Sequence, residues 1–319
     1  MPEDSHTAPT LWRPLGFGEI FDRAITLYVR NFIPFIGLVL VIAIPTGLYQ
    51  YYADSTIGMS SMFSTLSQGA STSQPIPAFF TPAFVGTLLV GIIVTAVFEL
   101  FVYNATAVGV AHLYAGKPVA FRSCYRIVLS RWARLVGMML MCIPIYIGFT
   151  TVAVVLAMLF FVPAAMMATS GRGPSIVLDV LGGLVVLGIA CAGAVTLAAV
   201  IFSFYGISIE GLRTMAAIGA GFARVFTRRE FWRALGLIVC MLIVSVVVGG
   251  IASGLGSVAL LLLHLPWLSA LLVTVVSLAV TPFSIILMAV YYYDVRIRHE
   301  GIDLEAKVER LVAGDIAPA

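Results

Sequence analysis

The stretch of sequence that decides the fold is Leu235–Leu263, which reads LGLIVCMLIVSVVVGGIASGLGSVALLLL. It contains no charged residue, and a helix needs about 20 apolar residues to cross the hydrocarbon core of a bilayer. A second apolar run, Leu268–Tyr293, follows after the short turn His264–Trp267. The two runs therefore predict a pair of transmembrane helices joined as a tight hairpin.

Four further apolar runs extend the same pattern over most of the chain: Phe32–Tyr52, Phe84–Leu113, Leu135–Ala168 and Ile176–Ile209. Of the 319 residues, 61% are hydrophobic and only 10% are charged, against about 25% charged in a typical soluble domain. Four or five spans would require one run of about 25 apolar residues to be a buried soluble helix, which we disfavour. We predict an all-α, polytopic membrane protein with six transmembrane helices, as three hairpins with cytoplasmic interfacial helices.

Positive charge lies almost entirely on one side of these spans. All of the 18 Lys and Arg residues except Arg172 fall in segments 1–31, 114–134, 210–234 and 294–319. The positive-inside rule makes that side cytoplasmic, and an even number of spans places both termini there. Because the basic residues are dispersed over four segments, they do not indicate a nucleic-acid partner.

The predicted organisation has three parts. Residues 1–31 form a cytoplasmic segment with an interfacial helix, 32–293 a six-helix transmembrane domain, and 294–319 a cytoplasmic tail. The start of the chain is polar and contains Glu3 and Asp4, where a signal peptide would carry basic residues. We therefore expect the first span to be retained as a membrane anchor.

A basic, partly amphipathic stretch precedes the first, third and fifth spans: Asp22–Phe35, Tyr125–Val136 and Ala223–Leu235. Each mixes arginine with aromatic and aliphatic residues at roughly helical spacing, as in helices that lie in the headgroup plane. One interpretation is an internal repeat of an interfacial helix followed by a helical hairpin. The other is convergence, because cytoplasmic flanks generally collect arginine and aromatic residues.

Glu99 lies near the middle of the second span, where a carboxyl group costs a few kcal/mol on insertion scales. Tyr103 follows one helical turn later and shares its face, while Asn104 lies on a neighbouring face. These residues are candidates for a proton-binding or substrate-binding group inside the helix bundle. The alternative is a protonated glutamic acid that is hydrogen-bonded to a neighbouring helix and serves packing.

Two charged groups on the cytoplasmic side are further candidates. Glu19, Asp22 and Arg23 precede the first span and form either a polar lock with later arginines or an exposed capping cluster. The densest basic group binds anionic lipid or a phosphorylated ligand in one interpretation and sets topology alone in the other. Its members are Arg224, Arg228, Arg229 and Arg233.

Catalytic and metal-binding patterns are missing from the sequence. The four cysteines and four histidines are scattered without ligand spacing. No phosphate-binding loop, nucleophile elbow or HExxH motif occurs. We therefore expect no metal and no cofactor, name no catalytic residue, and favour a role other than that of an enzyme.

Two terminal motifs carry a family resemblance: Arg13–Ala24, RPLGFGEIFDRA, and Tyr292–Glu305, YYDVRIRHEGIDLE. Shorter matches are Gly116–Val119 and the Glu210-Gly211 pair. Together they resemble the bacterial family usually labelled the glycerophosphoryl diester phosphodiesterase membrane domain. The resemblance implies a stand-alone membrane region in the bacterial cytoplasmic (inner) membrane. The hydrolase activity of the name belongs to a separate catalytic domain, which we do not expect here.

Two functions remain open at this point. The first is the handling or transport of a lipid or amphipathic small molecule, favoured by Glu99, the proline-containing spans and the basic interfacial stretches. The second is a non-catalytic membrane scaffold or an accessory subunit of a larger complex, favoured by the single intramembrane charge. The expected partners are membrane lipids, including anionic ones, and either a membrane protein or a second copy of the chain.

Overall fold

The computed structural model describes residues 13–57, 82–169, 176–263 and 266–301. These residues are almost entirely helical and contain no strand. Six helices are long and apolar enough to cross a membrane. The predicted all-α membrane fold with six spans is therefore confirmed.

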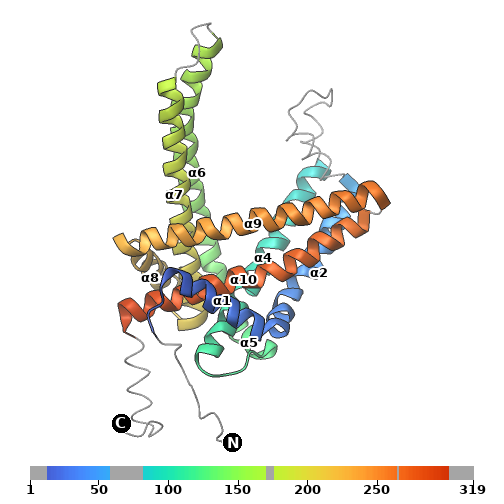
Figure 1. Ribbon diagram of the computed structural model, residues 1–319, viewed down its shortest axis with the longest axis vertical. Helices are drawn as coiled ribbons and strands as arrows, with labels where there is room; N and C mark the ends of the chain where they lie inside the picture. Colours follow the sequence, from blue (N-terminus) through green and yellow to red (C-terminus); the bar gives the residue numbers. More distant parts are fainter. Residues whose placement is uncertain (1–12, 58–81, 170–175, 264–265, 302–319) are drawn as a thin grey trace, which may run out of the picture. The chain divides into compact units, whose positions relative to one another are not determined.

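Each short helix precedes two long apolar helices, and this order occurs three times along the chain (Figure 1). The short helices are α1 (Phe17–Arg30), α5 (Phe121–Ser130) and α8 (Thr214–Val225). The long helices are α2 (Phe32–Ile57), α4 (Pro82–Tyr114), α6 (Trp132–Thr169), α7 (Ile176–Tyr205), α9 (Arg228–Leu263) and α10 (Pro266–Glu300). Only residues 264 and 265 separate α9 from α10. The chain thus contains three helical hairpins by connectivity, each with a short helix before it. Of these short helices, α1 and α5 are amphipathic and α8 is mostly apolar.

One or two non-helical residues separate each short helix from the span that follows. Asn31 and Arg131 are the single residues between α1 and α2 and between α5 and α6. Their carbonyls accept from the backbone N–H of Phe35 and Leu135, each at 3.2 Å, so each span begins its own hydrogen bonding there. Each of the basic, partly amphipathic stretches that precede these spans in the sequence therefore contains a helix boundary.

The first two junctions bury equivalent residues. Phe35 and Leu38 of α2 are fully buried, and so are Leu135 and Met138 at the same distance after the break in α6. The third junction has a two-residue break, at Phe226 and Thr227, and polar side chains follow it. This correspondence supports the interpretation of an internal repeat with a divergent third copy.

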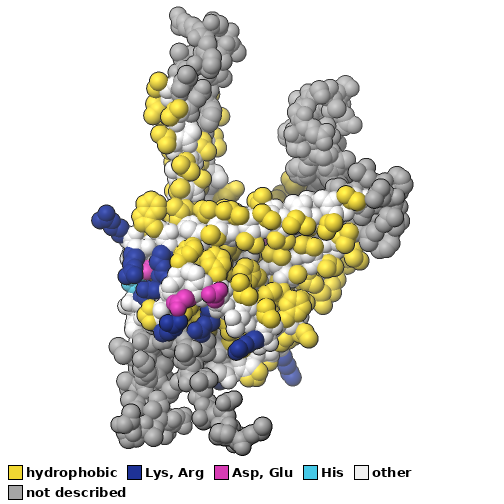
Figure 2. Space-filling model, in the orientation of Figure 1, with side chains coloured by type: hydrophobic (Ala, Val, Ile, Leu, Met, Phe, Trp, Pro, Cys, Tyr) yellow, Lys and Arg dark blue, Asp and Glu magenta, His cyan; other side chains and the backbone are white. Residues whose placement is uncertain are grey.

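The chain divides into two compact units. One comprises Met1–Phe17, Arg131–Leu242 and Tyr291–Ala319, and the other comprises Gly18–Ser130 and Ile243–Val290. Hydrophobic side chains cover the visible faces of α9 and α10 (Figure 2). Such surfaces suit helices whose solvent is lipid.

In the second unit, α2 packs against α4 around Val39, Ile42 and Val102. The Tyr125 hydroxyl of α5 donates to the Leu38 carbonyl at 2.7 Å, so the amphipathic helix is tied to the first span. In the first unit, α7 packs against both α6 and α8. The long connection between the first two spans, the turn 170–175 and the tail after residue 301 lie outside the described residues.

Candidate functional site

The last turns of α10 carry polar side chains on two adjacent faces. Tyr292, Arg296 and Glu300 recur every four residues and so share one face of the helix. Tyr291, Asp294 and Arg298 follow each other at spacings of three and four residues and share the next face. Each face meets carboxylates or arginines from other parts of the first unit.

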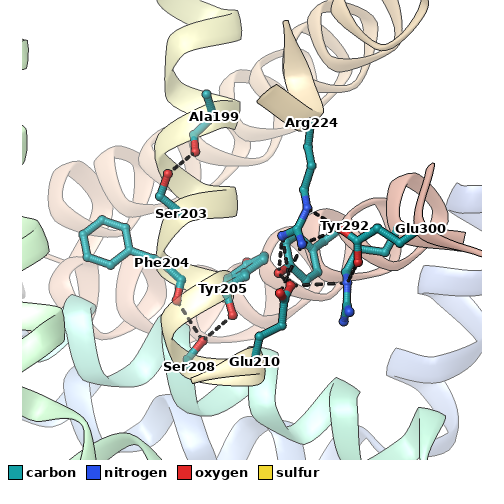
Figure 3. Close-up of polar contacts among 10 residues, drawn as sticks. Ala199, Ser203, Phe204, Tyr205, Ser208, Glu210, Arg224, Tyr292 and Glu300 are labelled. Carbon is teal, nitrogen blue, oxygen red and sulfur yellow. Dashed lines mark hydrogen bonds and ion pairs between the residues drawn. The ribbon is translucent and has the colours of Figure 1, made fainter. Parts of the chain in front are cut away.

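The first ionic cluster consists of Glu210, Arg224, Tyr292, Arg296 and Glu300. Arg224 of α8 donates to both carboxylate oxygens of Glu210, at 2.9 and 3.1 Å, and to the Tyr292 hydroxyl at 2.8 Å. Its Nε donates to Glu300 at 2.8 Å, while Arg296 donates to the other Glu300 oxygen at 2.7 Å. Figure 3 shows Glu210 and Arg224 converging on Tyr292. Three helical segments are therefore joined by charge-assisted hydrogen bonds.

A π-helix, η2 (Gly206–Glu210), positions Glu210 at the end of α7. It ends at Gly211, whose φ of 77° is left-handed and suits glycine. Arg131 donates to the Ile207 and Ser208 carbonyls at 2.9 and 2.6 Å, so it satisfies backbone groups at the end of the helix. Burial, with a smaller effect of neighbouring Arg134, lowers the pKa of Arg131 from its ordinary value.

The second ionic cluster consists of Glu230, Arg233, Asp294 and Arg298, and it holds the backbone of Leu15. The Leu15 N–H donates to Asp294 at 2.6 Å, and its carbonyl accepts from Arg298 at 2.5 Å and from Arg233 at 3.1 Å. Asp294 also pairs with Arg233 at 2.7 Å and with Arg298 at 3.0 Å. The Asp294 side chain has no exposed area. The backbone at Leu15 is thereby fixed to α9 and α10.

Both ionic clusters are balanced in charge, because each contains two arginines and two carboxylates. Burial alone would lower the pKa of Arg224, but the hydrogen bond with Glu210 and the charges of Glu210 and Glu300 raise it above its ordinary value. Arg224 therefore stays charged and paired. This arrangement joins segments that are distant in sequence and leaves its arginines neutralised by protein carboxylates.

The structure separates the four arginines that the sequence groups as an anion-binding candidate. Arg224 and Arg233 belong to the two ionic clusters, with side chains only 10% and 15% exposed. Arg228 and Arg229 are exposed at the start of α9. Of the four arginines, only Arg228 and Arg229 have side chains that a ligand in solution or at a membrane surface can reach.

The predicted polar lock of Glu19, Asp22 and Arg23 lies on α1. Asp22 is exposed there, while Glu19 and Arg23 are half-buried. The carboxylates of the two ionic clusters come instead from η2, α9 and α10. A role for the α1 residues as a lock stays a prediction.

Glu99, Tyr103 and Asn104 lie in the span α4 of the second unit. Glu99 is half-buried, and Tyr103 follows one turn later on the same face of α4. Asn104 is only 2% exposed, and its amide nitrogen donates to the Leu100 carbonyl at 2.7 Å. Its amide oxygen is buried and has no hydrogen-bond partner among the described residues. An intramembrane carboxyl group and an unsatisfied amide oxygen therefore lie on neighbouring turns.

Sequence reasoning named Arg224 and Arg233 as site candidates but no other member of the ionic clusters. It also missed Leu15, which the second cluster holds, and Tyr291, whose hydroxyl donates to the Glu230 carbonyl at 3.1 Å. One signal was present, since YYYDVRIRHE places polar residues at helical spacing directly after an apolar run. Their partners are far away in sequence and leave no local pattern. Among the described residues, no group of three or more His, Cys, Asp or Glu side chains could hold a metal ion.

The fold and its apolar helices define a multi-pass α-helical membrane protein. Comparison with known proteins does not assign the chain to a family within this class. No family model, no curated protein and no solved structure matches the chain. The resemblance of its terminal motifs to the phosphodiesterase membrane-domain family therefore stays a prediction.

Proposed function

We propose that the protein binds and moves a lipid or another amphipathic small molecule in the bacterial cytoplasmic membrane, with both termini in the cytoplasm. The observation that carries this proposal is the polar group in α4, where Glu99 and Tyr103 share one face and the buried amide oxygen of Asn104 has no hydrogen-bond partner among the described residues. Ionisable residues within a span are costly and commonly mark a substrate or ion pathway. A ligand hydroxyl, amine or amide would supply the missing donor.

Energetics support a ligand at this position. A buried polar atom without a partner costs about 1–3 kcal/mol, and hydrocarbon offers no water to repay that cost. Glu99 supplies an acceptor and Tyr103 a hydroxyl within the same two turns of α4. An amphipathic ligand places its polar head against these groups and its chain against the surrounding apolar side chains.

Native mass spectrometry of the gently extracted protein tests the proposal. We expect a defined lipid or small molecule to stay bound to the wild type and to be lost from Glu99→Gln and Asn104→Leu. The matched control is Asp22→Asn, which alters an exposed carboxylate outside the spans. Equal retention by the wild type and both α4 variants would exclude a ligand at this site.

A membrane scaffold or accessory subunit is the second candidate, and the ionic clusters favour it. They use two of the four candidate arginines to hold the chain's own segments together. A protein partner that co-purifies in fixed stoichiometry, together with no selective ligand, would support this function over ligand handling.

We also propose that the chain is related to the phosphodiesterase membrane-domain family. The contacts between its motif residues support this, because Leu15 of the first motif is held by Asp294 and Arg298 of the second. Tyr292 of the second motif also donates to Glu210 of the Glu210-Gly211 pair. Aligned relatives are expected to keep an acidic residue at Asp294 wherever they keep the RPL motif; its frequent loss would contradict the proposal.

A further inference from the structure

We infer that the turn between α8 and α9 is a binding site for the headgroup of an anionic phospholipid. The site consists of the exposed arginines Arg228 and Arg229 with the aromatic side chains around them. It does not depend on the function proposed for Glu99, which lies in the other unit.

Unpaired positive charge distinguishes this turn. Arg228 and Arg229 are adjacent, exposed and in no ion pair with the described residues. The neighbouring Arg224 and Arg233 are neutralised by Glu210, Glu230, Glu300 and Asp294. Within the described part of the chain, the ionic clusters thus take up the nearby carboxylates and leave Arg228 and Arg229 without an anionic partner. A phosphodiester accepts hydrogen bonds from guanidinium groups in the required geometry.

Four aromatic rings form a continuous series around the same turn. Phe222 and Phe226 stack with ring centroids 5.5 Å apart, Phe226 contacts Phe231 at 6.4 Å, and Phe231 contacts Trp232 at 5.4 Å. Phe226 and Trp232 are 50% and 67% exposed. Exposed aromatic side chains next to arginine are typical of the membrane–water interface, where rings meet acyl chains and arginine meets phosphate.

The junction between α5 and α6 has a different arrangement of arginines. At α5, Arg122 and Arg126 are exposed, but they lie one turn apart within the helix. At the start of α6, Arg134 donates to the Gly211 carbonyl at 2.7 Å. The α5 pair therefore provides a control of equal charge, and Trp132, exposed at the start of α6, provides the aromatic control.

The test is a native mass spectrometry titration of the full chain with phosphatidylglycerol or with phosphatidylcholine. We expect the double variant R228Q/R229Q to bind phosphatidylglycerol about 30-fold more weakly, on the basis of the usual gain for two basic side chains near an anionic surface. R122Q/R126Q is expected to change the affinity for phosphatidylglycerol little, and R228K/R229K is expected to retain most of that affinity. Trp232→Ala should weaken binding more than Trp132→Ala.

Each contrary result overturns the inference in a different way. An equal loss in R122Q/R126Q would show a general effect of net charge. Equal binding of phosphatidylcholine would show that the headgroup charge is not recognised. Displacement of the lipid by inorganic phosphate at the same concentration would show a site for free anions. Glu99→Gln is expected to leave this titration unchanged, so the two proposals can fail separately.

Discussion

Gly221 and Gly219 lie on the same helix, α8, but in different surroundings. A Cβ atom on Gly221 would lie 2.2 Å from the Ser203 hydroxyl and 2.6 Å from the Ala199 carbonyl oxygen, which is backbone and cannot rotate away. Gly219 has open space at the same position. Gly221→Ala is therefore expected to lower stability by about 1–3 kcal/mol through overpacking. Gly219→Ala should be neutral or slightly stabilising in the same thermal melt in detergent; equal melting of the two variants would contradict the close approach of α7 and α8.

Asp294 is the residue whose charge the second ionic cluster most requires. Asp294→Asn keeps the shape of the side chain but leaves Arg233 and Arg298 without their shared anion. Removing one partner of a buried ion pair typically costs about 3–5 kcal/mol. We expect a marked fall in the melting temperature, and no change for the exposed control Arg122→Gln. Unchanged melting of Asp294→Asn would mean that the cluster contributes little to stability.

Sequence could nominate some residues of the ionic clusters but not their partners. Arg224 and Arg233 were predicted as candidate site residues because they lie in the densest basic segment of the sequence. Leu15 belongs to the first terminal motif, but the motif does not indicate its contact with Asp294, because that contact uses backbone groups, which every residue has. The contact between Leu15 and Asp294 spans 279 positions of the chain, and no local periodicity encodes a pairing at that distance. The density of positive charge also suggested that four arginines form one anion-binding group. In the structure, Arg224 and Arg233 are paired with carboxylates, while Arg228 and Arg229 are exposed.

The π-helix η2 shows how one element places a carboxylate. It depends on Arg131, whose guanidinium donates to two of its carbonyls. Hydrogen bonds to charged groups contribute about 1.5–3 kcal/mol each. Arg131→Met, which keeps the stem of the side chain, should therefore increase amide hydrogen exchange in residues 206–213 by at least about tenfold. Arg126→Met on the exposed face of α5 is the control; the same exchange in both variants would show that η2 holds its shape without Arg131.

The long helices were predictable because hydrocarbon requires a continuous apolar run for each span. The residues at which these helices begin and end were less predictable. The break at Arg131 has neither proline nor glycine, the usual signals of a helix boundary, whereas Pro34 in the first turn of α2 marks the break at Asn31. Polar residues near the start of α9, Glu230 and Arg233, and at the end of α10 also continue the helix, because the ionic clusters pair their charges. Hydropathy therefore gave the spans, while tertiary contacts set where the helices begin and end.

For the molecule as a whole, the distribution of basic residues predicts the orientation in the membrane. The connection between the second and third spans should be cytoplasmic, and the connection between the third and fourth should face the other side. We expect an impermeant maleimide to label Gly171→Cys in intact spheroplasts and Arg122→Cys only after permeabilisation. The wild type is the control: burial raises the pKa of the Cys124 thiol to about 11, so it stays protonated and slow to react near neutral pH. Cys142, Cys191 and Cys240 lie within spans. Labelling of Arg122→Cys in intact spheroplasts would reverse the orientation, and labelling of both variants there would contradict the odd number of spans between 122 and 171.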